Sequence, residues 1–201
     1  MLVFPNAPVI LISVDTLRAD RLPAYGYQRI ETPNLDALRR DSVLFENAYS
    51  QVPLTLPSHT SLFTGRLPPQ NGVRDNIGYR LGPEPETLAG FLKKNGYATG
   101  GAVSSIVLAE ATGVSRGFDF YSDDVEPTAI SQSLGRVQRG GMETVRRLEE
   151  WLAGVDEKPF LAFLHLFEPH TPYEPPEPYK SRYSSAYDGE VAARTRSSAN
   201  S

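Results

Sequence analysis

The order of apolar runs along the chain constrains its fold more than any other feature. Three runs have the length and apolar content of buried strands: residues 9–14, 97–103 and 160–167. Three segments among them have helix start signals or apolar side chains at helical spacing: residues 33–40, 87–94 and 142–152. Because strands and helices alternate, the sequence predicts an α/β fold with a mainly parallel sheet and helices on both faces.

The first run, residues 9–14, reads Val-Ile-Leu-Ile-Ser-Val and is followed by Asp15. A continuous apolar run of this length is typical of a strand buried on both faces of a parallel sheet. Asp15 then lies at the carboxyl end of the strand, where open α/β sheets bind ligands and metals. The alternative is that Asp15 caps the turn after it.

The helix expected at residues 142–152 is amphipathic, and Met142 and Trp151 lie on its apolar stripe. We interpret both side chains as core residues. The segments 66–86 and 104–140 are rich in glycine, proline and aspartate, so we expect long loops there.

Composition fits an enzyme-like domain and argues against two kinds of partner. The chain has 201 residues, of which 40% are hydrophobic, and can bury one core. Its net charge of −4 predicts no nucleic-acid partner, and no apolar run reaches the length of a membrane span. No signal peptide is evident. The default expectation is a cytoplasmic protein, and a periplasmic or otherwise exported one if the N-terminus is incomplete.

Residues 55–66 read Thr-Leu-Pro-Ser-His-Thr-Ser-Leu-Phe-Thr-Gly-Arg. Pro57 fixes φ, and Ser58 is a good N-cap for a helix. The segment therefore predicts a loop that presents Thr55 at a helix N-terminus. The N–H groups and the positive dipole end of such a terminus suit a phosphate or sulfate group. An ordinary capped helix start is the alternative.

This run resembles the sulfatase signature, in which Cys or Ser is followed by any residue, Pro, Ser and Arg, then by small and apolar residues and Thr-Gly. Thr55 stands where the family has its nucleophile, and His59 stands where sulfatases have arginine. Another branch of the alkaline phosphatase superfamily, the nucleotide pyrophosphatase/phosphodiesterases, has the same threonine and histidine pairing. The resemblance implies a sulfatase-like α/β fold and hydrolysis of an ester.

The resemblance also implies roles for individual residues. Asp15 corresponds to the first metal-binding aspartate, and Thr55 is both nucleophile and metal ligand. His59 and Asn76 correspond to positions around the oxyanion. The amide of Asn76 can donate a hydrogen bond to an oxyanion without adding a cation. A turn residue is the alternative for Asn76.

Two histidines follow or lie within the run at 160–167. The string Pro-His-Thr-Pro-Tyr resembles the sulfatase segment whose histidine faces the ester oxygen, which implies that His170 is a leaving-group donor or an oxyanion contact. His165 lies among apolar neighbours, and we interpret it as a core imidazole rather than a ligand.

The resemblance implies a divalent metal ion, which is calcium, zinc or manganese, that activates the Thr55 hydroxyl. Formylglycine is not expected, because the chain has no cysteine and oxidation of threonine gives a ketone. Three departures from the family weaken the metal site. Asp15 replaces a pair of aspartates, the Gly-Lys-Trp-His segment is absent, and no Asp-His or Asp-Asn pair completes the site before Ser201.

The expected domain organisation is a lead at residues 1–7, a partial sulfatase-like domain at 8–190 and a disordered tail at 191–201. Residues 192–201 contain no large apolar side chain, which is typical of a truncated or frame-shifted end. A natural flexible terminus is the alternative.

Two functions stay open at this point. The first is a metal-dependent hydrolase or transferase that acts on small-molecule sulfate or phosphate esters through Thr55. Within that class a phosphodiesterase or pyrophosphatase is the rival, because Thr55, His59 and Asn76 favour phosphoryl chemistry. The second is an inactive fragment that retains the anion-binding half of the site. The sequence does not indicate an oligomeric state.

Overall fold

The structure of the protein is a computed structural model that describes residues 5–125 and 138–195. Its contacts divide the chain into two compact units. The first unit contains residues 1–13 and 50–167, and the second contains residues 14–49 and 168–201.

The first unit is built on a four-stranded sheet. The strands are β1 (Val9–Val14), β2 (Ala98–Val103), β3 (Phe120–Ser122) and β4 (Phe160–Leu166). Their order is β1-β4-β2-β3, and β2 pairs in parallel with both β4 and β3. Gly100 of β2 lies opposite Ala162 on one side and Phe120 on the other. The predicted α/β fold is confirmed.

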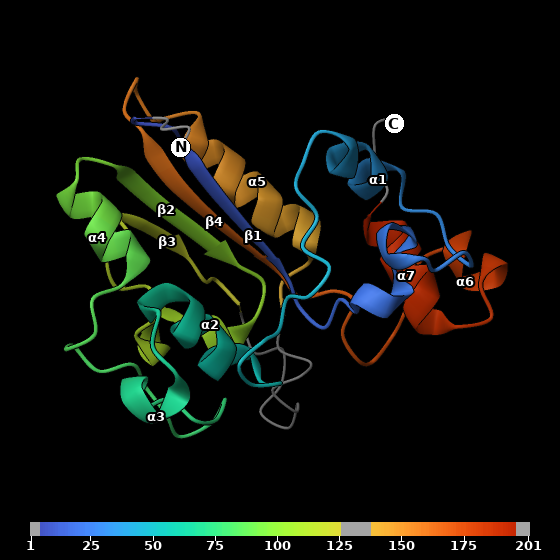
Figure 1. The fold of residues 1–201 in the computed structure, drawn as a ribbon, viewed down its shortest axis with the longest axis horizontal. Coiled ribbons are helices and arrows are strands. Elements are labelled where there is room, and N and C mark those ends of the chain that lie inside the picture. The colour runs from blue at the N-terminus through green and yellow to red at the C-terminus, as the bar shows by residue number, and fades with distance from the viewer. Residues whose placement is uncertain (1–4, 126–137, 196–201) are drawn as a thin grey trace. The chain divides into compact units, whose positions relative to one another are not determined.

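Helices cover both faces of this sheet (Figure 1). They are α2 (Thr55–Thr64), α4 (Leu88–Lys94) and α5 (Gly141–Leu152). The short helix α3 (Pro68–Asn71) packs against α2, and 3-10 turns lie at Ile106–Leu108 and Glu110–Thr112. Successive residues of a strand point to opposite faces. Accordingly, Val103 packs in one core cluster with Phe63 of α2, whereas Ala102 packs in another with Leu148 of α5.

Local signals explain where these helices begin and end. The Thr87 hydroxyl accepts a hydrogen bond from the Gly90 N–H at 3.0 Å and so caps α4. The helix stops at Asn95, and Gly96 follows with a φ of +87°. Helix α5 is amphipathic, as predicted, and buries Leu148 against the sheet.

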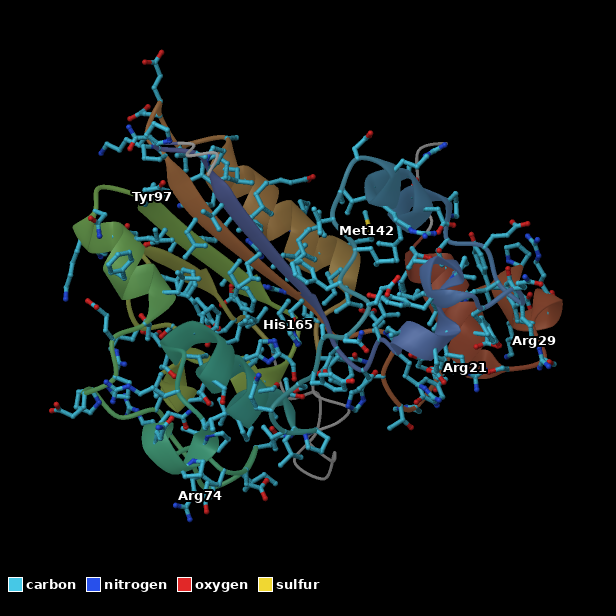
Figure 2. The ribbon with its side chains drawn as sticks, viewed as in Figure 1. Arg21, Arg29, Arg74, Tyr97, Met142 and His165 are labelled. Carbon is cyan, nitrogen blue, oxygen red and sulfur yellow. The ribbon has the colours of Figure 1, made fainter. Side chains whose placement is uncertain are left out.

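Three expectations for this unit were wrong. The run at residues 9–14 is not buried on both faces, because Ile10 is 60% exposed and Ile12 is 56% exposed. The physical reason is that β1 stands at the end of the strand order within the described residues, next to β4. Met142 is 64% exposed at the start of α5 rather than in the core (Figure 2). The segments 66–86 and 104–140 are not all loop, because the first contains α3 and the second contains β3.

The second unit consists of short helices. They are α1 (Pro33–Arg40), α6 (Tyr179–Arg182) and α7 (Ala186–Arg194), with 3-10 turns at Ala19–Arg21 and Pro23–Tyr25. Its core contains Ile30, Tyr187, Val191 and Ala192. Residues 191–194 were expected in a disordered tail, but they continue α7, because Val191 and Ala192 bury their side chains in this core. Residues 196–201 of that expected tail lie outside the described residues.

One further property concerns the chain as far as the structure describes it. None of its helices within residues 5–125 and 138–195 has the length and hydropathy that crossing a membrane requires.

Candidate active site

Thr55 is the first residue of α2, so the expected helix N-terminus is present but begins four residues earlier than predicted. Ser58 is not the N-cap. Its hydroxyl donates to the Thr55 carbonyl at 3.0 Å, and its N–H donates to the Leu54 carbonyl at 3.1 Å. The reason is that Pro57 lies in the first helical turn, where its missing N–H costs no intrahelical hydrogen bond. The helix can therefore run through Pro57.

The cap of α2 comes from a distant residue. The side-chain oxygen of Asn76 accepts a hydrogen bond from the Leu56 N–H at 2.8 Å. This bond satisfies one of the N–H groups that a helix leaves without an intrahelical partner. Because the oxygen of the carboxamide faces Leu56, its NH₂ group is directed to the other side and keeps its ability to donate.

His59 lies in the next turn of α2 and is 6% exposed. Its Nδ1 is 2.7 Å from the Thr55 carbonyl oxygen, and its Nε2 is 2.8 Å from the Ser13 hydroxyl. Its ring lies edge-on to the rings of Phe163 and His165, with centroids 6.0 Å and 5.1 Å away. The His59 ring thus contacts the main-chain carbonyl of Thr55 on one side and the hydroxyl of Ser13 on the other.

His165 is a core residue, as expected. It belongs to β4, has no exposed surface, and lies opposite Val103 of the neighbouring strand (Figure 2). The His165 ring contacts the His59 ring and so packs against α2, the helix that carries Thr55.

Asp15 belongs to the second unit and precedes an unusual backbone conformation. Its Oδ1 accepts a hydrogen bond from the Thr16 N–H at 3.0 Å, and Thr16 has a φ of +54°. A positive φ is unfavourable for a β-branched residue and persists where surrounding contacts fix it. Here the Thr16 hydroxyl donates to the Pro169 carbonyl, and the Tyr187 hydroxyl donates to the Thr16 carbonyl at 2.8 Å.

His170 lies in the same unit, in the loop after β4. Its Nδ1 is 2.8 Å from the Thr171 carbonyl oxygen. A carbonyl oxygen can only accept, so Nδ1 carries a proton, and Nε2 is the nitrogen that would exchange a proton with a ligand.

A buried carboxyl group accepts a hydrogen bond from the loop that follows β4. Glu190 of α7 is 3% exposed, and its Oε1 accepts a hydrogen bond from the Glu174 N–H at 2.7 Å. Burial raises the pKa of Glu190 above its ordinary value, although the hydrogen bond from Glu174 opposes the shift. The nearby ion pair between Arg194 and Glu168, at 3.1 Å, adds a cation and a second carboxylate to this environment.

The structure therefore groups the predicted residues as two sets. Thr55, His59 and Asn76 meet at the N-terminus of α2 in the first unit, and Asp15 and His170 belong to the second. Within residues 5–125 and 138–195, no group of three or more His, Asp and Glu side chains could hold a metal ion. The described residues thus do not fit a complete metal site, and the expected pair of ligands, Asp15 and Thr55, is divided between the units.

Ser13 is the functional candidate that sequence reasoning missed. It is a single hydroxyl in an apolar strand, two residues before Asp15. Its position within the run at residues 9–14 was a signal, because a polar side chain inside a strand needs a hydrogen-bond partner. The identity of that partner, His59, depends on the tertiary structure.

Comparison with known proteins finds similarity to sulfatases. The model of the sulfatase family matches residues 7–201. An arylsulfatase of Clostridium perfringens is 39% identical over 98 residues, which are 47% of this chain and 19% of that protein. An N-acetylglucosamine-6-O-sulfatase of Bacteroides thetaiotaomicron is 26% identical over 183 residues, which are 85% of this chain and 32% of that protein.

Solved structures show the same fold. One was determined in complex with its substrate, D-glucosamine-2-N,6-O-disulfate, and has a TM-score of 0.70 at 23% identity over 84% of this chain and 36% of the other. The phosphonate monoester hydrolase of Agrobacterium radiobacter has a TM-score of 0.69 and is 22% identical, and the match covers 89% of this chain and 44% of that chain. The chain thus spans 19% and 32% of the two curated relatives and less than half of either solved chain.

Proposed function

The chain belongs to the sulfatase family, and from that premise we propose that it hydrolyses sulfate or phosphate esters with Thr55 as the nucleophile. The observation that carries this proposal is the N-terminus of α2. Thr55 is its first residue, and Asn76 is anchored there through its side-chain oxygen. The Thr55 hydroxyl, the N-terminus of α2 and the Asn76 amide support the proposal, because such groups suit a negatively charged ester.

In the proposed reaction the Thr55 Oγ attacks the sulfur or phosphorus atom of the ester, and the hydroxyl proton passes to water. The bond to the ester oxygen breaks, and that oxygen takes a proton as it leaves. His170, with a proton on both ring nitrogens, is the residue proposed to donate it from Nε2. The N-terminus of α2 and the NH₂ group of Asn76 stabilise the negative charge on the other oxygens. Water then hydrolyses the covalent Thr55 ester and regenerates the hydroxyl.

Sulfatases are typically metal-dependent, and a bound divalent ion would lower the pKa of the attacking hydroxyl. Asp15 is the residue proposed to contribute a carboxylate to it. The described residues do not complete a set of three ligands for such an ion.

Phosphodiester hydrolysis is the second candidate. Thr55 favours it, because threonine cannot form the aldehyde that formylglycine chemistry needs, and the chain has no cysteine to replace it. An alkoxide attacking phosphorus needs no such aldehyde.

The test is hydrolysis of an aryl sulfate, a phosphate monoester and a phosphodiester, each with added Ca²⁺, Zn²⁺ or Mn²⁺. Thr55→Ala should abolish turnover, whereas Thr55→Ser, which keeps a hydroxyl, should retain part of it. Intact-mass spectrometry of the quenched reaction should detect the covalent ester at residue 55. Undiminished turnover by Thr55→Ala contradicts the proposal, and the preferred substrate decides between the two candidates.

A further inference from the structure

We infer that Ser13 is a positioning residue for Thr55, and that it acts by holding the ring of His59 in place. The inference rests on the proposed function of Thr55. It concerns a chain of two hydrogen bonds that runs from the end of β1 to the first residue of α2.

The first bond of this chain sets one proton. Nδ1 of His59 lies 2.7 Å from the carbonyl oxygen of Thr55. A carbonyl oxygen has no proton to donate, so Nδ1 must carry one. The neutral His59 ring in this geometry is therefore the Nδ1–H tautomer.

The second bond follows from the first. In the neutral Nδ1–H tautomer, Nε2 has a lone pair and accepts a hydrogen bond. The Ser13 hydroxyl is 2.8 Å from Nε2 and donates to it. This bond satisfies the Nε2 lone pair in the tautomer that holds the Thr55 carbonyl, and it fixes the position of the ring.

The packing around His59 holds its ring against the Thr55 carbonyl. His59 is 6% exposed, and its ring is packed between Phe163 and His165 at 61° and 77° to their planes. The ring therefore has little room to turn away. In the Nε2–H tautomer, the Nδ1 lone pair would face the Thr55 carbonyl oxygen at hydrogen-bond distance, and the two would repel each other.

Loss of the Ser13 bond would let the His59 ring shift, and such a shift would act on the residue proposed as the nucleophile. Thr55 begins α2, so a shift of its carbonyl group also shifts the turn that carries its hydroxyl. A misplacement of about 1 Å can reduce a reaction rate by about 100-fold. Loss of the Ser13 hydroxyl should therefore reduce kcat more than it changes KM.

The experiment compares the wild type with Ser13→Ala and Ser13→Thr. The ¹⁵N shifts of the imidazole nitrogens report the tautomer of His59, and assignment is practical because the chain has 3 histidines. The carbonyl ¹³C shift of Thr55 reports its hydrogen bond. Ser61→Ala is the matched control, because Ser61 is a buried hydroxyl of the same helix that donates to the Pro57 carbonyl instead.

We expect Ser13→Ala to shift the His59 Nε2 and Thr55 carbonyl signals and to lower kcat by about 10- to 100-fold, with KM within about twofold. Ser13→Thr should restore these values, and Ser61→Ala should leave the His59 signals unchanged. The inference is overturned if the folded Ser13→Ala protein keeps the wild-type His59 and Thr55 shifts. Because these readouts need no turnover, they decide the inference even if Thr55 proves not to be the nucleophile.

Discussion

The side-chain oxygen of Asn76 accepts a hydrogen bond from the main-chain N–H of Leu56 at 2.8 Å. The two residues are 20 positions apart, and the bond closes the N-terminus of α2 beside Thr55. Asn76 is thus a helix cap and, through its NH₂ group, a candidate oxyanion donor. Variants can separate these two roles.

Replacing Asn76 by alanine should remove both roles. Loss of a capping acceptor costs about 1 kcal/mol of unfolding free energy. Asn76→Asp keeps an acceptor for the Leu56 N–H but loses the NH₂ donor and adds a negative charge. We expect Asn76→Ala to lower stability and turnover, and Asn76→Asp to lower turnover while its urea midpoint stays near that of the wild type. Equal stability of all three proteins would show that Asn76 does not cap α2.

Ser58→Ala should have a small effect on stability. Its hydroxyl donates back to the Thr55 carbonyl within the helix and satisfies no N–H group of the helix terminus. Alanine also has the higher helix propensity. The measurement is the urea midpoint of Ser58→Ala beside that of Asn76→Ala. A loss of about 1 kcal/mol, the usual cost of a lost cap, would return Ser58 to the capping role.

Gly100→Ala should destabilise the first unit. A Cβ at this position would lie 2.4 Å from the Trp151 ring, so the ring would have to move. Overpacking of a core by one methyl group typically costs about 1–3 kcal/mol. Gly82→Ala is the control, because a Cβ there meets nothing within 4 Å. Chemical denaturation of both variants is the measurement, and equal midpoints would mean that Trp151 is not held against Gly100.

Glu190→Gln should change how stability depends on pH. The raised pKa of Glu190 means that the folded protein binds this proton more tightly than the unfolded chain. The contribution of Glu190 to stability therefore falls as the pH rises from its unfolded value toward and through the raised value in the folded protein. Gln cannot ionise, so the variant should gain stability relative to the wild type as the pH rises from 4 to 7. Parallel stability curves over this range would contradict the assignment.

Part of the fold could be predicted because its signals are local. Thr87 and Asn95 mark the ends of α4, and the bounds of α1, Pro33–Arg40, follow from Pro33 and the charged last turn. The strand β3 was missed because it has three residues, too few to show a period of its own. The exposure of Ile10 was missed because burial depends on which elements lie beside a strand.

The sequence by itself determined the alternation of strands and helices, the position of Thr55 at a helix N-terminus and the likeness to the sulfatases. These properties depend on propensities and spacings within a few residues. The tertiary structure decided that Asn76 caps α2 and that Ser13 holds His59. Both partnerships join segments that are far apart in the chain, and a hydrogen bond is set by the position of its two atoms rather than by their distance in sequence.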